Sequence, residues 1–501
     1  MFVPIRVPRV SAAAALGALT PLGFAPHGWY ALPAVTLAGL LLLVDGQRAP
    51  RAFLLGWVFG LAQFGVGVHW LYIALHTFGE APIWLGILLT GAMCCTLALY
   101  PAAVVALAVR HGWLRAHIGW VAVPALWLFA ELLRRTLFWG GFPWFSLGYS
   151  QTDSPLRALA PLLGVYGISA VVVWVAYALF RLAVARTRGA VMVALPALLA
   201  PAVCLLLPAP ESWTRVDGEP VATAIIQGDL SIDQKYAQGM QQRVVNNFQT
   251  LTMQNLDRRL IVWPEAALPM TLQDAQPFIA NLRDVLRAHN TALLFGAVNE
   301  QPGPDSHPRY FNSAIADGAA VGRYDKRHLV PFGEFFPIPD FLRPLMMVLG
   351  TPYDDIMRGA REQAPLTLAG NKVDVSICYE DVYGSEFRHD ARDAGFLINI
   401  TDDAWYGRSD AAVQHLQIAR MRALEYGREI VRATATGVSA FIGADGQARQ
   451  QTPLFEVLAI RDDVQPRTGV TPYVRWGDAP LWWLSGLISA GALYLTRRRK
   501  S

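Results

Sequence analysis

The sequence predicts a multi-pass α-helical membrane domain with eight spans, joined to a separate α/β domain. The first observation is composition: the 501 residues are 53% hydrophobic and only 16% charged, which is too apolar for an ordinary soluble protein of this size. The second is the uneven distribution of apolar runs, which fill the N-terminal part and return once near the C-terminus. The third is the polar stretch 212–475, which is long enough for one domain and alternates between strand-like and helix-like segments.

Eight apolar segments each have about the roughly 20 residues that a helix needs to cross a bilayer core. We therefore expect seven spans in a membrane domain of residues 1–211, and an eighth span with a basic tail in 476–501. The first span follows Arg6 and Arg9 like a signal peptide, but it lacks a convincing processing site and is expected to be retained. The predicted spans are about 10–26, 29–45, 53–75, 82–109, 118–134, 164–184, 190–208 and 479–496.

Basic residues in the short loops predict the orientation, because Lys and Arg resist translocation. If the N-terminus is inside, the outer short loops carry Arg157, with Arg134 and Arg135 at the edge of a span. An even number of spans also places both basic termini on the same side. We expect both termini in the cytoplasm and 212–475 outside it. The inner segments carry Arg6, Arg9, Arg48, Arg51, Arg110, Arg115, Arg181, Arg186, Arg188, Arg497, Arg498, Arg499 and Lys500.

The polar domain has the pattern of an α/β layer structure, in which helices cover the faces of a sheet. Segments of helical period cover about 234–257, 273–289 and 411–428, and short β-branched or apolar runs lie between them. The predicted strands are Val221–Gln227, Leu260–Trp263, Ala292–Val298, Ser313–Asp317, Val373–Cys378, Phe396–Ile400 and Ile430–Ala435.

Cys378 is the only cysteine of the polar domain, and it ends a predicted strand. A thiol with an ordinary pKa of about 8.5 is mostly protonated at neutral pH, so a nucleophilic cysteine needs a base or a positive neighbour. Glu265, at the end of another apolar strand, is a candidate general base. Lys326 is a candidate to stabilise an oxyanion, together with the backbone N–H of Tyr379.

Glu334 and Glu380 are expected to orient this lysine or to share its charge. Each functional interpretation has an ordinary alternative: a solvated loop carboxylate for Glu265, surface charge for Lys326, and buried packing for Cys378. The other cysteines fall within predicted spans and are expected to be small packing residues; they are Cys94, Cys95 and Cys204.

The segments around Glu265, Lys326 and Cys378 resemble the Glu-Lys-Cys triad of the nitrilase superfamily. The whole chain resembles the bacterial apolipoprotein N-acyltransferase family, which implies eight spans and a nitrilase-like αββα sandwich between the last two. The motifs that carry the resemblance are Trp263–Pro269, His328–Phe335, Cys378–Glu380, Asn399–Trp405, Asp403–Gly407 and Gln414–Glu425, with Gly141–Trp144 and Gly148–Tyr149 in the membrane part.

The resemblance implies an acyltransferase with Glu265 as base, Lys326 as the residue that stabilises the intermediate, and Cys378 as nucleophile. Glu334, Tyr379 and Glu380 match supporting residues. The implied donor is a glycerophospholipid, whose acyl chain forms a thioester. The implied acceptor is the α-amine of the N-terminal diacylglyceryl cysteine of an apolipoprotein, in the bacterial inner membrane with the domain on the periplasmic side.

Two positions depart from the family pattern. Tyr236 stands where tryptophan is expected, so its role in substrate entry is carried over with a changed side chain. Asp402 stands where asparagine is more familiar.

The apolar segment 335–350 is the candidate lipid-facing lid, because it is unusually apolar for an exported loop and contains flexible methionines. The alternative is a buried helix of the domain core. The expected lipid-contacting residues are Phe335, Phe336, Phe341, Leu342, Met346 and Met347, with Tyr236 at the entry.

The sequence is also compatible with two other functions. A membrane-anchored amidase or nitrilase-type hydrolase would share the first half-reaction, and a transporter or sensor would use the domain only to bind ligands. We expect a monomer, no cofactor or metal, and no nucleic-acid partner. Glu131 and Arg135, one helical turn apart near the end of a span, are expected to pair locally.

Overall fold

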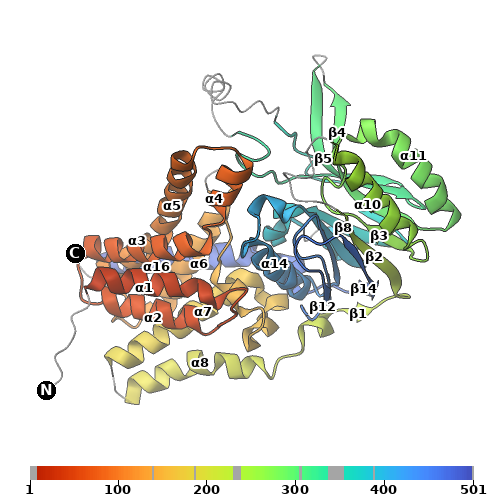
Figure 1. Cartoon of the computed structure of the whole chain (residues 1–501). Helices are drawn as coiled ribbons and strands as arrows, with labels where there is room; N and C mark the ends of the chain where they lie inside the picture. The colour runs from red at the N-terminus through yellow and green to blue at the C-terminus, as the bar shows by residue number, and fades with distance from the viewer. Residues whose placement is uncertain are drawn as a thin grey trace. The chain divides into compact units, whose positions relative to one another are not determined.

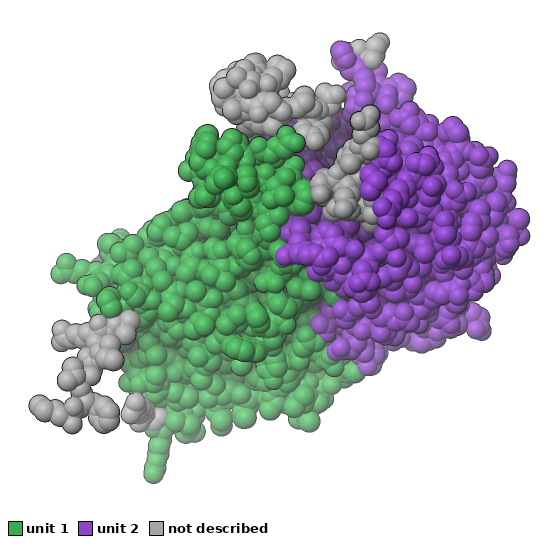
Figure 2. Space-filling model, viewed as in Figure 1, with its two compact units in different colours: residues 1–210, 409–417, 471–501 green, residues 211–408, 418–470 purple. Residues whose placement is uncertain are grey.

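The computed structural model describes residues 8–137, 140–185, 188–228, 239–303, 307–336, 355–387 and 390–498. The chain divides into two compact units, which Figure 2 colours separately. Unit 1 comprises Met1–Pro210, Ser409–Gln417 and Thr471–Ser501, and unit 2 comprises Glu211–Arg408 and Ile418–Val470. The helices are α1 (Arg9–Leu19), α2 (Leu32–Val44), α3 (Ala49–Gly67), α4 (Leu71–Ile73), α5 (Ile83–Arg110), α6 (Gly119–Thr136), α7 (Ala160–Val184), α8 (Arg188–Cys204), α10 (Gln241–Met253), α11 (Leu272–Ala288), α13 (Gly384–Phe387), α14 (Ala411–Tyr426), α15 (Pro472–Trp476) and α16 (Ala479–Arg498).

Unit 1 is helical, and a helix lies in each of the eight segments that the sequence predicts as spans. Among the described residues, three helical stretches are long and apolar enough to cross a membrane: Ala49–Gly67, Ile83–Arg110 and Pro155–Val184. The helices Leu32–Val44 and Arg188–Cys204 are apolar but shorter. That all eight segments cross a bilayer stays a prediction.

The predicted span 53–75 is not one continuous helix. Helix α3 ends at Gly67, and Val68 has non-helical backbone angles of φ −123° and ψ 26°. The side chain of Trp70 is then buried, and its Nε1 donates to Gln414 Oε1 at 3.1 Å. Trp144 Nε1 donates to the same oxygen at 3.0 Å. The break in the helix thus comes two residues before Trp70, one of the two donors to this shared acceptor.

Arg135 is not paired with Glu131, as expected from their spacing, but with a residue far along the chain. Its Nη1 lies 2.7 Å from Asp478 Oδ2, and both side chains are buried. The ion pair joins α6 to the start of α16, and these two helices pack together. Glu131 Oε1 instead accepts from Trp127 Nε1 at 3.1 Å and from the Leu147 N–H at 3.0 Å. The local prediction was wrong because a neighbouring helix supplies a buried carboxylate to Arg135.

Unit 2 contains two six-stranded sheets, which confirms the α/β prediction. The first sheet has the order β13-β2-β3-β4-β5-β6, and the second has the order β12-β11-β10-β9-β8-β7. In each sheet three neighbouring strands run parallel: β2, β3 and β4 in the first, and β8, β9 and β10 in the second. The strands are β1 (Arg215–Val216), β2 (Val221–Gln227), β3 (Leu260–Val262), β4 (Ala292–Pro302), β5 (Pro308–Gly318), β6 (Gly322–Asp325), β7 (Leu366–Leu368), β8 (Asn371–Ile377), β9 (Phe396–Thr401), β10 (Ile430–Thr434), β11 (Ala440–Ile442), β12 (Ala448–Gln451), β13 (Leu458–Val464) and β14 (Arg467–Thr468).

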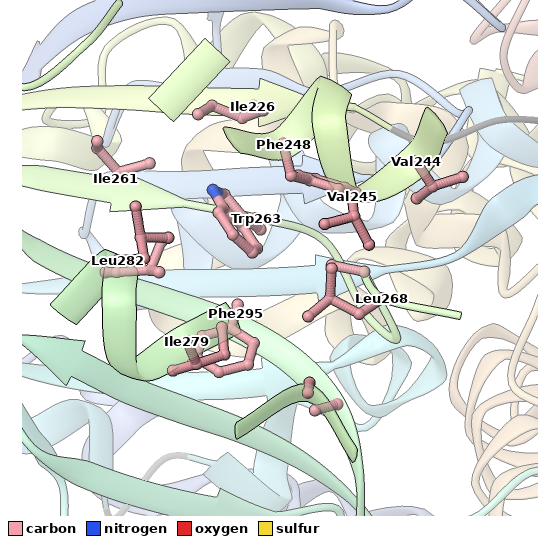
Figure 3. Packing of buried hydrophobic residues seen from close by; sticks show 14 of the residues in the cluster. Ile226, Val244, Val245, Phe248, Ile261, Trp263, Leu268, Ile279, Leu282 and Phe295 are labelled. Atoms are coloured by element: carbon pink, nitrogen blue, oxygen red, sulfur yellow. The ribbon is translucent and has the colours of Figure 1, made fainter. Parts of the chain in front are cut away.

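Helices α10 and α11 cover one face of the first sheet (Figure 1). Their apolar sides meet alternate residues of β2, β3 and β4, as the 3.6-residue period of a helix and the two-residue period of a strand require. Figure 3 shows Phe248 of α10 and Ile279 of α11 packed against Trp263 and Phe295. Trp263 also satisfies its indole N–H by donating to Thr252 Oγ1 at 3.1 Å. This core holds the end of β3, where Glu265 follows.

The second sheet is covered by the C-terminal half of α14. Side chains of α14, β8, β9 and β10 line a cavity of about 20 Å³, room for roughly one water molecule. The opposite faces of the two sheets meet through Gln227 of β2. Its Oε1 accepts from Ser439 Oγ at 2.8 Å, Thr452 Oγ1 at 2.9 Å and Thr434 Oγ1 at 3.2 Å. The sandwich therefore has a buried polar connection as well as apolar layers.

All seven predicted strands are present, as β2, β3, β4, β5, β8, β9 and β10, with ends that shift by a few residues. The prediction for 273–289 corresponds to α11 and that for 411–428 to α14. Of the predicted helix 234–257, the structure describes α10, and residues 234–238 lie outside the described part of the chain.

Candidate active site

Cys378 lies where β8 ends and the short 3₁₀-helix η7 (Cys378–Val382) begins. Its φ is +53°, in the left-handed region that residues other than glycine rarely adopt. Strained turns from a strand into a helix are a recurrent mount for nucleophiles, because they hold the side chain at the end of the sheet. The side chain is 8% exposed. The sulfur is therefore fixed by the backbone and largely shielded from water.

Glu265 follows β3 and is positioned by its close approach to β4. The Gly296 N–H donates to the Pro264 carbonyl at 3.0 Å. A Cβ on Gly296 would lie 2.5 Å from the Glu265 Cα, so this approach requires glycine. The buried carboxylate accepts from Asn312 Nδ2 at 2.6 Å through Oε1, and from the Asp402 N–H at 2.9 Å through Oε2. Both oxygens are thus held from separate segments of the chain.

Lys326 follows β6 and is 1% exposed. Its Nζ lies 3.2 Å from Glu265 Oε1 and 2.8 Å from Glu334 Oε1. Asn312 Nδ2 donates to the same two oxygens, so the amide and the ammonium bridge the two carboxylates together. Burial by itself would lower the pKa of Lys326, but the two carboxylates outweigh it and raise this pKa well above its ordinary value. Lys326 is therefore a fixed cation.

The thiol of Cys378 is electrostatically coupled to the same groups. Burial raises the pKa of Cys378 well above its ordinary value, and the charge of Glu265 raises it further. The ammonium of Lys326 and the hydroxyl of Thr401 lower this pKa in part. The resting thiol is therefore protonated at neutral pH. Attack by sulfur then requires a base that takes the proton during the reaction.

Glu380 ties the segment after β6 to the turn after β8. Its fully buried carboxylate accepts from the N–H groups of Arg327 at 2.6 Å, His328 at 2.9 Å and Ile377 at 2.8 Å. Tyr324 donates its hydroxyl to the same carboxylate at 2.9 Å. Burial raises the pKa of Glu380, although these backbone N–H bonds lower it in part. The Glu380 carboxylate therefore holds backbone N–H groups of two segments together, and its supporting role in the reaction stays a prediction.

Comparison with known proteins places these features in a family. The family model for the apolipoprotein N-acyltransferase N-terminal domain matches residues 16–178, and the carbon-nitrogen hydrolase model matches residues 223–470. The apolipoprotein N-acyltransferase of Methylococcus capsulatus is 39% identical, with 97% of this chain and 95% of that protein covered. The enzyme of the same name from Nitrosomonas europaea is 39% identical over 98% and 99% of the two chains. That of Vibrio cholerae is 35% identical over 99% of both.

The chain belongs to the apolipoprotein N-acyltransferase family. Proteins of this family are bacterial membrane enzymes, and the apolar helices of unit 1 are consistent with a membrane location. The carbon-nitrogen hydrolase match covers the two-sheet unit and gives it a nitrilase-like fold.

The described residues of the expected lid are only partly buried. The guanidinium of Arg358 lies over the Phe335 ring at 5.4 Å. The Phe336 N–H donates to Asp355 Oδ1 at 3.2 Å. Tyr379 is not part of the lid but is expected to support the catalytic residues. Its ring stands edge-on to Tyr383, with centroids 5.4 Å apart. The other expected contact residues lie outside the described part of the chain; they are Tyr236, Phe341, Leu342, Met346 and Met347.

Two residues of the site, Asn312 and Thr401, were not singled out from sequence, and Asp402 was singled out only as a departure from the family pattern. Asn312 joins both carboxylates to Lys326, and its only sequence signal was an amide just before a predicted strand. Thr401, the last residue of β9, lowers the pKa of the Cys378 thiol. Asp402 contributes its backbone N–H to Glu265, and its side chain caps the 3₁₀-helix η9 (Asp403–Tyr406) by accepting from the Ala404 N–H at 3.0 Å. Asparagine and aspartate both serve as such caps, which accounts physically for the Asp402 departure.

Across the residues that the structure describes, no group of three or more His, Cys, Asp or Glu side chains is arranged to hold a metal ion.

Proposed function

We propose that this protein transfers an acyl chain from a glycerophospholipid, through a thioester on Cys378, to the α-amine of the N-terminal diacylglyceryl cysteine of apolipoproteins. Family membership supports the reaction class. The observation that carries the mechanism is the buried cluster in which Lys326 Nζ lies 3.2 Å from Glu265 and 2.8 Å from Glu334, electrostatically coupled to the Cys378 thiol.

In the first half-reaction, Glu265 takes the thiol proton while the sulfur attacks the acyl carbonyl of the phospholipid. The new C–S bond gives a tetrahedral intermediate, whose oxyanion is stabilised by the Lys326 ammonium and by the backbone N–H of Tyr379. The C–O bond to glycerol then breaks, and Glu265 returns the proton to the leaving oxygen. A lysophospholipid leaves, and the acyl chain remains as a thioester.

In the second half-reaction, the neutral α-amine of the lipid-modified cysteine attacks the thioester carbonyl. Glu265 takes a proton from the nitrogen, Lys326 again stabilises the oxyanion, and the C–S bond breaks. The proton passes to sulfur, which restores the thiol and releases an amide. A thioester is readily aminolysed and the amide is not readily reversed, so the sequence runs toward N-acylation.

The location of both substrates supports a membrane-facing site. Moving an acyl chain into water costs about 0.8 kcal/mol per CH₂, so a lipid substrate favours a site that opens toward the bilayer. We propose eight spans in the inner membrane, both termini in the cytoplasm, and the nitrilase-like domain of about 212–475 on the periplasmic side. We further propose that 335–350 is the lipid-facing lid and that the protein acts as a monomer.

Intact mass spectrometry tests the proposal. The purified protein is incubated with a diacyl glycerophospholipid alone, with Cys378→Ala as control. We expect an acyl adduct on the wild type and none on the variant. Addition of a diacylated lipopeptide should remove the adduct and yield N-acylated peptide.

A hydrolase is the second candidate, because the carbon-nitrogen hydrolase model matches residues 223–470. The same experiment separates the two functions. Release of free fatty acid at the same rate with or without lipopeptide would favour hydrolysis, and absence of any adduct on folded protein in lipid would argue against both enzymatic functions.

A further inference from the structure

Arg432 is a fully buried cation in the middle of β10 that the proposed chemistry does not use. The β-sheet register pairs it with Asn399 of β9, and Asn399 with Ser376 of β8. Residues in register on neighbouring strands point to the same face of the sheet. Ser376, Asn399 and Arg432 therefore form one row across three strands, and Cys378 follows Ser376 by two residues.

The guanidinium of Arg432 bonds to three different segments of this region. Its Nη1 donates to Asn399 Oδ1 at 2.5 Å, and its Nη2 donates to Asp403 Oδ2 at 3.1 Å. Nη1 also lies 3.4 Å from Asp381 Oδ2. Asp381 belongs to η7, which begins at Cys378, and Asp403 belongs to η9. One side chain thus fixes the segments that surround the nucleophile turn.

The bond to Asn399 continues to Cys378 itself. Because Arg432 occupies the amide oxygen of Asn399, the Nδ2 of this amide faces β8. It donates to Ser376 Oγ at 3.0 Å and lies 3.4 Å from the Cys378 carbonyl oxygen. The orientation of the amide is therefore set by Arg432, and the amide in turn contacts the backbone of the strained turn.

Arg432 also compensates the negative charges near the Cys378 thiol. Asp381 and Asp403 are both buried, and the charge of Asp403 opposes ionisation of the Cys378 thiol. A buried carboxylate without a compensating cation is costly, and it also disfavours a second negative charge nearby.

We propose that Arg432 is a positioning residue for the reaction, which holds the turn that carries Cys378 through Asn399 and compensates the charges of Asp381 and Asp403. The inference rests on the proposed function for its link to acyl transfer. Its test measures the thiol directly and does not require any acyl substrate.

The pH profile of Cys378 alkylation by iodoacetamide, followed on the Cys378 peptide of the full-length protein in detergent, tests this role. We expect Arg432→Met to shift the profile to higher pH and to lower the alkylation rate at pH 7.5 at least tenfold, since one pKa unit is a factor of ten. Arg432→Lys keeps the charge but loses the fork geometry, so we expect a smaller shift. Removing the opposing charge as well, in Arg432→Met with Asp403→Asn, should restore part of the rate.

The charged and titratable groups that face the thiol or Arg432 are Glu265, Lys326, Asp381, Asp403 and Tyr406.

Arg428→Met is the matched control. Arg428 is also buried, near the start of the same strand, but its Nε and Nη2 donate to the carbonyls of Ala394 and Gly469, each at 2.7 Å. Its loss should lower thermal stability without moving the alkylation profile. The proposal is overturned if folded Arg432→Met and Arg432→Lys keep the wild-type profile, or if Arg428→Met shifts it equally. If the protein formed no acyl adduct with lipid, the proposed function would fail while this alkylation result still stood.

Discussion

Glu265 affects the neighbouring thiol in two opposite ways. Its charge raises the pKa of Cys378, so it makes the resting thiol harder to ionise. In the proposed mechanism, however, it is also the group that accepts the thiol proton. Lys326 does not accept the thiol proton, and it affects the pKa of Cys378 in the opposite direction from Glu265. Its ammonium lowers this pKa.

Replacing Glu265 should therefore separate ionisation of the thiol from turnover, whereas replacing Lys326 should impair both. With Glu265→Gln, we expect the alkylation profile of Cys378 to move to lower pH while N-acylation falls about 10²- to 10⁴-fold, the usual contribution of a general base. With Lys326→Met, alkylation should move to higher pH and N-acylation should also fall. Iodoacetamide alkylation between pH 6 and 10 and lipopeptide acylation measure the two effects. A shift of both profiles in the same direction would contradict the assignment.

Glu380 offers a stability test, because its carboxylate accepts from three backbone N–H groups and a hydroxyl. Glu380→Gln places an NH₂ group against these donors. Leaving buried partners unsatisfied costs about 1–3 kcal/mol, so we expect a lower melting temperature in detergent. Glu362→Gln, at an exposed position, is the control and should leave the melting temperature unchanged. Equal melting temperatures for the two variants would show that Glu380 does not hold the two segments together.

The close approach of β4 to the segment after β3 bears directly on the position of Glu265. Gly296→Ala would place a methyl group 2.5 Å from the Glu265 Cα. The carboxylate should move by a fraction of an ångström or more, and misplacement of about 1 Å can cost 100-fold in rate. We expect N-acylation to fall 10- to 100-fold while circular dichroism stays native. Gly91→Ala, at a helical position with open space around it, should keep full activity.

The ion pair between α6 and α16 is the second test at this scale. Arg135 and Asp478 are both buried, so removing one partner leaves an uncompensated charge, which costs about 3–5 kcal/mol. We expect Arg135→Met to lower the melting temperature strongly, and Arg135→Met with Asp478→Leu to recover most of the loss. Fluorescence-detected melting in detergent measures both. Additive losses in the double variant would show that the two side chains act independently.

For the molecule as a whole, the proposed orientation can be tested by cysteine labelling. In a Cys378→Ala background, Gln450→Cys lies at an exposed position of unit 2, and Arg115→Cys lies in a predicted inner loop where the native side chain is 70% exposed. A membrane-impermeant maleimide should label Gln450→Cys in intact spheroplasts and Arg115→Cys only after lysis. The reverse pattern would invert the topology.

Sequence reasoning reached the strands that are rich in β-branched residues and the three segments that carry Glu265, Lys326 and Cys378. It missed β13, because Leu458–Val464 contains Arg461, Asp462 and Asp463 and does not read as an apolar run. It also missed Asn312 and Arg432, whose importance depends on sheet register between distant segments. Such contacts leave no local pattern, whereas a strand or a helix does.

The arrangement of the first sheet has a consequence for biosynthesis. Its first long strand, β2, is flanked on one side by β13, the strand that leaves the ribosome last among the sheet's members. Gln227 at the end of β2 likewise accepts hydrogen bonds from Ser439 and Thr452, which are synthesised more than 200 residues later. The nascent domain therefore keeps an open edge until almost all of it has been synthesised, and chains truncated before residue 458 should be trapped by chaperones or degraded.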